Sequence, residues 1–111
     1  MSGFQAQRQR LPNRRCHEVI QFEHGGFTYI AGIGRFADER LAEVFLTAAK
    51  TGTAVEAAAR DAASVASLAL QHGVPVETLR HALTRNGDGS PSSALGRLVD
   101  LLASGTKARR S

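Results

Sequence analysis

The periodicity of apolar residues changes once along this chain, near Lys50, and this change limits the possible folds more than any other feature. Before it, short runs alternate apolar and polar residues between turn residues, which is typical of β-strands. After it, apolar residues recur every three or four positions, as in helices. Strands followed by helices predict an α+β fold rather than a parallel α/β sheet.

Three runs have the composition of strands: residues 17–23, 27–33 and 41–47. Gly25 and Gly26 separate the first two, which predicts a tight hairpin because the centre of such a turn needs positive φ. The polar residues 37–40 predict a second turn. Three strands joined by short turns predict a three-stranded antiparallel meander.

A long alanine-rich helix should follow the strands. Thr53 and Glu56 fit a capping box, and Gly73 suits the position just after a helix that ends at about His72. The stretch 62–70 holds no charged residue, so more than one side of this helix should be buried. We therefore expect it to pack on the sheet.

Two shorter helices are predicted after the long one. The first should run over 75–84 and end before Asn86 and Gly87, and the second should begin at Ser92 or Ser93 and end at about Ala103. The apolar stripe of the last helix is Leu95, Leu98, Val99 and Leu102.

The net charge of +4 is unevenly distributed. Residues 1–15 carry four arginines and no acid, and residues 104–111 carry three bases and no acid. Residues 16–103 carry seven bases and all ten acids, a net charge of −3. The chain is too short for two cores, so we predict a basic arm, one α+β domain over 16–103 and a basic tail. The two basic segments are either solvated or attract nucleic acid or a phosphorylated ligand.

Several classes of protein are excluded by simple patterns. No apolar run approaches the roughly 18 residues of a membrane span, and residues 1–15 lack a signal-peptide core. The single cysteine, Cys16, excludes an internal disulfide and a multi-cysteine zinc site. We expect a cytoplasmic protein with no membrane, metal or cofactor.

Apolar residues occur on both faces of the predicted strands. In the first strand, Ile20 and Phe22 are on one face and Val19 is on the other. In the second strand, Tyr29 and Ile33 are on one face and Ile30 is on the other. One layer of helices covers only one face of a sheet, so the other needs a second partner. We predict a homodimer or a higher homo-oligomer.

The start of the long helix is a candidate anion site, because free backbone N–H groups and the helix dipole favour negative charge there. It is not a P-loop, since Phe45 stands where the first glycine is required. An ordinary helix cap is the alternative. The candidate residues for phosphate or nucleotide are Lys50, Thr51, Gly52 and Thr53, assisted by Arg14, Arg15 or Arg35.

Other motifs are weaker. Residues 32–37 match the dinucleotide fingerprint G-x-G-x-x-A as text, but a strand follows instead of a helix, so a strand-end or bulge role is predicted. Asp61 next to Arg60 predicts a structural or functional ion pair, in which Arg35 or Arg80 could also take part. Cys16 and the four histidines show neither catalytic nor metal-ligand spacing, so no catalytic residue is assigned.

Six segments, in order and suitably spaced, resemble the TSCPD domain family. They are residues 11–15 (LPNRR), 34–38 (GRFAD), 41–46 (LAEVFL), 50–52 (KTG), 59–62 (ARDA) and 68–73 (LALQHG). This family comprises the C-terminal part of adenosylcobalamin-dependent ribonucleotide reductases and small free-standing proteins, and the chain looks like the free-standing kind.

The resemblance implies that the chain is linked to ribonucleotide reduction but does not catalyse that reaction. The Thr-Ser-Cys-Pro-Asp string that names the family is absent, and one cysteine cannot supply the radical cysteine and cysteine pair of a reductase. We therefore predict a non-catalytic module associated with a ribonucleotide reductase or with deoxynucleotide metabolism. The alternatives are a nucleic-acid-binding protein that uses its basic segments and, third, a small enzyme that uses Asp61 or Cys16.

Overall fold

The computed structural model describes residues 17–50 and 52–104, and the predicted α+β order is confirmed. The strands are β1 (His17–His24), β2 (Phe27–Arg35) and β3 (Leu41–Ala48). They form one antiparallel sheet in the order β1-β2-β3, which is the predicted meander. Gly25 and Gly26 have φ of 59° and 83°, so the hairpin turn uses the conformation that favours glycine.

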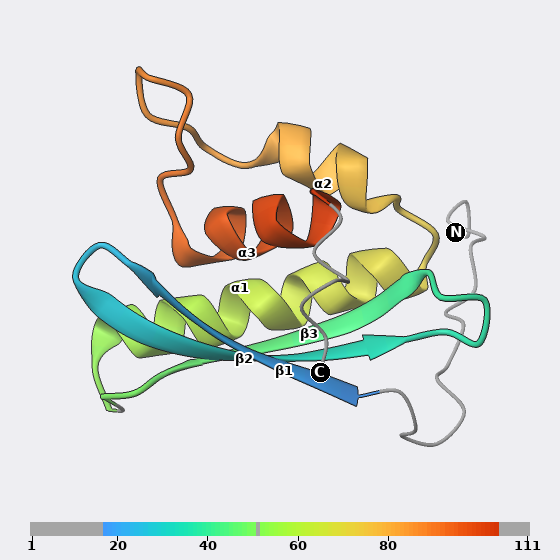
Figure 1. Cartoon of the computed structure of the whole chain (residues 1–111), viewed down its shortest axis with the longest axis horizontal. Helices are drawn as coiled ribbons and strands as arrows, with labels where there is room; N and C mark the ends of the chain where they lie inside the picture. Colours follow the sequence, from blue (N-terminus) through green and yellow to red (C-terminus); the bar gives the residue numbers. More distant parts are fainter. Residues whose placement is uncertain (1–16, 51, 105–111) are drawn as a thin grey trace, which may run out of the picture.

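Three helices follow: α1 (Ala54–Gln71), α2 (Val76–Ala82) and α3 (Ala94–Ala103). All three lie on one side of the sheet (Figure 1). The inner sheet face and the small residues of α1, together with Leu95, Leu98 and Val99 of α3, form the core. Ala59, Ala63 and Ala66 are buried, so the alanine-rich stripe lets α1 approach the sheet closely.

Helix α1 also protects the free edge of β3. The Ser67 hydroxyl accepts from the Val44 N–H at 2.9 Å and donates to the Val44 carbonyl at 3.0 Å, and Gln71 Nε2 donates to the Ala42 carbonyl at 3.0 Å. An edge strand with unpaired backbone groups invites aggregation. Side chains of α1 satisfy those groups here.

One local prediction needs correction, and another is confirmed. Helix α2 ends at Ala82 rather than Thr84, because the next residue, Leu83, is extended with ψ of 151°. The chain then forms a narrow loop in which Arg85 pairs with Pro91 as an isolated bridge. The glycines of the G-x-G-x-x-A text lie in β2, where the register shifts between Gly34 and Arg35, as the bulge interpretation predicted.

Candidate functional site

The predicted anion site lies at the start of α1. Lys50 and Gly52 are exposed, and Gly52 has φ of 78°. The Thr53 hydroxyl accepts from the Glu56 N–H at 3.1 Å, which confirms the Thr53 half of the predicted capping box. Thr51, Arg14 and Arg15 lie outside the described residues.

The first turn of α1 carries an acid of the chain itself. Glu56, in the first turn of α1, is only 2% exposed. Its carboxylate accepts from Arg60 Nη2 at 2.7 Å, from Arg60 Nε at 3.1 Å and from the Thr47 hydroxyl at 3.0 Å. The Arg60 hydrogen bonds hold the pKa of Glu56 below its usual range, although burial acts in the opposite direction. Glu56 therefore supplies negative charge where a phosphate was expected.

Arg35 does not reach the start of α1. Its Nε contacts Glu18 Oε2 at 3.3 Å, and its Nη1 donates to the Glu39 carbonyl at 3.1 Å. Lys50 follows the end of β3 that pairs with Tyr29, six residues along β2 from Arg35. That separation is about 20 Å at the rise of a β-strand. The described members of the predicted phosphate site are thus not brought together.

The predicted ion pair also has a different partner. Arg60 pairs with Glu56 through two hydrogen bonds, while Asp61 is exposed and acts on Arg60 only through its charge. Arg80, which was expected as a partner of Asp61, contacts Asp100 and Glu77 instead. The expectation that Arg35 or Arg80 pairs with Asp61 was wrong.

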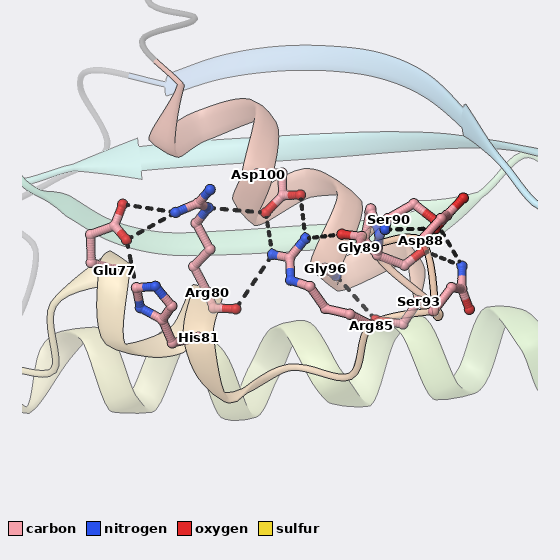
Figure 2. Close-up of polar contacts among 12 residues, drawn as sticks. Glu77, Arg80, His81, Arg85, Asp88, Gly89, Ser90, Ser93, Gly96 and Asp100 are labelled. Atoms are coloured by element: carbon pink, nitrogen blue, oxygen red, sulfur yellow. Dashed lines mark hydrogen bonds and ion pairs between the residues drawn. The ribbon is translucent and has the colours of Figure 1, made fainter.

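The densest polar cluster joins α2, α3 and the loop between them (Figure 2). Asp100 accepts from Arg85 Nη2 at 2.6 Å, from Arg85 Nη1 at 2.9 Å and from Arg80 Nε at 3.2 Å. Arg85 also donates to the Gly89 carbonyl at 3.0 Å, and Arg80 to Glu77 at 3.1 Å. Hydrogen bonds from Arg85 are the main reason that the pKa of Asp100 lies below its usual range.

This arginine–aspartate cluster is structural in its geometry. Asp100 is engaged by two guanidinium groups, so it is not set up to take a proton from a substrate. The sequence gives no spacing signal for it, because Arg85 and Asp100 are 15 residues apart and lie in different elements. It holds the loop and α2 against α3.

The outer face of the sheet carries three large apolar side chains that are exposed. Val19, Ile30 and Phe45 come from three different strands and are 70%, 39% and 53% exposed. Gly32 pairs with both Val19 and Phe45, so no side chain fills the space between them. A hollow of about 460 Å³ lies here, and Arg60 and Ser64 of α1 also line it. We call the surface of Val19, Ile30 and Gly32 the bare face.

No group of three or more metal-ligating side chains occurs within residues 17–50 and 52–104. Across the same ranges, no helix combines the length and apolar character needed to cross a membrane. Cys16 lies outside the described residues.

Comparison with known proteins identifies one family. The model of the TSCPD domain matches residues 5–108. A vitamin B12-dependent ribonucleotide reductase of Agrobacterium fabrum is 37% identical over 78 residues, which are 70% of this chain and 6% of that protein. Proteins with the same name from Rhodopirellula baltica and Bradyrhizobium diazoefficiens are 30% and 32% identical over 68% and 70% of this chain, which span 7% and 6% of their own lengths. No solved structure matches the chain.

Proposed function

The chain belongs to the TSCPD domain family, and from this premise we propose that it is a small non-catalytic module that associates with a ribonucleotide reductase. The observation that carries the proposal is the match to vitamin B12-dependent ribonucleotide reductases over about 70% of this chain. The same match spans only 6% of each of those proteins. The chain corresponds to one small part of such an enzyme.

The proposed role is binding rather than catalysis. Ribonucleotide reduction needs a radical-bearing cysteine and a reducible cysteine pair, and this chain has one cysteine. The two acids described above, the buried Glu56 and the partly buried Asp100, are both held by arginines rather than placed toward a substrate. A surface that recognises another protein fits these features better than a reaction centre.

A direct assay tests the non-catalytic part of the proposal. The full chain is incubated with adenosylcobalamin, a dithiol reductant and ribonucleoside di- or triphosphates, and the products are separated by chromatography. We expect no deoxynucleotide, because the required cysteines are missing. A vitamin B12-dependent reductase in the same buffer is the positive control, and turnover by the chain alone would overturn the proposal.

We further propose that the bare face packs against the bare face of a second copy. Val19 and Ile30 present exposed apolar side chains that are costly to leave in water, and they come from neighbouring strands. A two-fold axis brings the same patch of each copy together. The hollow beside Gly32 gives room for an apolar side chain from the second copy.

The two ligand hypotheses from the sequence stay predictions. A phosphate at Lys50, Gly52 and Thr53 would have to compete with the Glu56 carboxylate for the positive end of α1. Nucleic-acid binding depends on the basic segments 1–15 and 104–111, whose basic residues lie outside the described part of the chain, whereas residues 16–103 carry a net charge of −3. Neither hypothesis is needed for the proposed module.

A further inference from the structure

A second cavity lies on the inner side of the molecule, at the end of the sheet where β1 turns into β2. It has a volume of about 490 Å³, within the usual range for small-molecule sites. One wall is the surface of α1 that carries Val55, Ala58 and Ala62. The opposite side is formed by Phe27 and Tyr29 of β2 and by the first residues of α3.

The first turn of α3 brings hydrogen-bond donors to this cavity. The Ser93 hydroxyl accepts from the Gly96 N–H at 3.1 Å. Within the described residues, the N–H groups of Ala94 and Leu95 have no hydrogen-bond partner, although both residues are buried. No acidic residue lies in this turn, in contrast to α1, where Glu56 is present. The positive end of α3 is therefore not neutralised locally.

Tyr29 gives an independent indication of a ligand. Its side chain is stacked on Phe22 with ring centroids 5.6 Å apart, and the residue is only 3% exposed. Its hydroxyl has no hydrogen-bond partner among the described residues, whereas buried tyrosine hydroxyls usually have one. Every fully buried side-chain polar atom of those residues is satisfied, so the Tyr29 hydroxyl keeps some accessible surface, and Tyr29 lines this cavity.

We propose that this cavity binds a phosphate monoester of a flat aromatic group. The phosphate would accept from the N–H groups of Ala94 and Leu95, which is the usual arrangement at a helix N-terminus. The aromatic group would lie between Phe27 and the alanine surface of α1, and the Tyr29 hydroxyl would donate to a polar atom of the ligand. The lining of this cavity includes no residue of the bare face and none of Lys50, Gly52 and Thr53.

The test is a titration of the ¹⁵N-labelled full chain, followed by amide chemical shifts. The probes are phenyl phosphate, adenosine 5′-monophosphate, adenosine and inorganic phosphate. We expect the two monoesters to shift the Ala94 and Leu95 amides, and adenosine or inorganic phosphate alone to bind at least about 10-fold more weakly, because each supplies half of the contacts.

Three variants locate the site. Tyr29→Phe removes one hydroxyl and should weaken monoester binding about 5- to 10-fold, the usual effect of one hydrogen bond. Ala58→Leu should fill the cavity and abolish binding, and Ala57→Leu, an exposed neighbour that does not line the cavity, should bind like the wild type. Circular dichroism confirms that each variant is folded.

Two results would overturn this inference. One is monoester binding that Ala58→Leu leaves unchanged and Lys50→Ala removes, which would place the phosphate at α1. The other is the absence of shifts at Ala94 and Leu95 at saturating ligand. Both results leave the proposed association with a reductase unaffected, because that proposal does not use this cavity.

Discussion

In the proposed dimer, replacing Val19 by aspartate should separate the two copies. Val19 is 70% exposed and lies on the bare face in the same row as Gly32 and Phe45. In a two-fold dimer the substitution places two carboxylates in an apolar interface, where each loses its hydration. We expect the dissociation constant to rise about 100-fold or more, as for a hot-spot residue. Sedimentation velocity over a range of protein concentrations measures the change.

Val65→Asp is the matched control for this experiment. Val65 is 67% exposed, so the same chemical change is made at nearly the same exposure, but on α1 rather than on the sheet. The control should associate like the wild type. Equal weakening by both substitutions would mean that added negative charge, not the bare face, controls association. A wild-type chain that is monomeric at micromolar concentration would refute the dimer itself.

Replacing Asp100 by asparagine should lower the stability of the protein. The substitution removes the charge that Arg80 and Arg85 share, and α2 and the loop are held to α3 through it. The side chain of Asp100 is 23% exposed, so solvent screens part of the interaction. We expect the free energy of unfolding to fall by about 1–2 kcal/mol, measured by urea denaturation.

The pH dependence of this loss gives a second test. Arg85 lowers the pKa of Asp100 in the folded protein, relative to about 3.9 in an unfolded chain. The stabilisation is therefore fully present above that unfolded-state value and disappears as the pH falls through the lower folded-state pKa. The difference between wild type and Asp100→Asn should be constant near neutral pH and shrink below about pH 4.

Asp38→Asn is the control for the Asp100 experiment. Asp38 also pairs with an arginine, at 2.7 Å from Arg40 Nε, but both side chains are more than half exposed. Exposed ion pairs contribute little to stability, so no measurable change is expected. If Asp100→Asn were as mild as this control at neutral pH, the arginine–aspartate cluster would not hold α2 and the loop in place.

The order of elements and most of the core follow from local patterns. Gly25 and Gly26 specify the hairpin through their backbone freedom, and Thr53 specifies the start of α1 through its hydroxyl. These features depend on residues a few positions apart. The prediction placed the end of α2 two residues too late. Leu83 is extended next to a loop that the Arg85–Asp100 pair ties to α3, and local propensity does not include such a contact.

The candidate site could be predicted only in part, because its contacts are between distant residues. The capping-box spacing identified Glu56, but not that its carboxylate would bond to Thr47 of β3 and to Arg60. Arg35 was predicted to assist at Lys50, but the strand register places Arg35 about 20 Å along the sheet from the end of β3 that precedes Lys50. Register and tertiary contacts decide such questions, and neither can be inferred from residue spacing alone.

The central claim, that this chain is a module associated with a reductase, has one direct test. The fluorescently labelled chain is sedimented with a purified vitamin B12-dependent ribonucleotide reductase from the same organism. We predict that the label moves with the reductase boundary and that excess unlabelled chain displaces it. Labelled chain that sediments alone at every reductase concentration would contradict the claim.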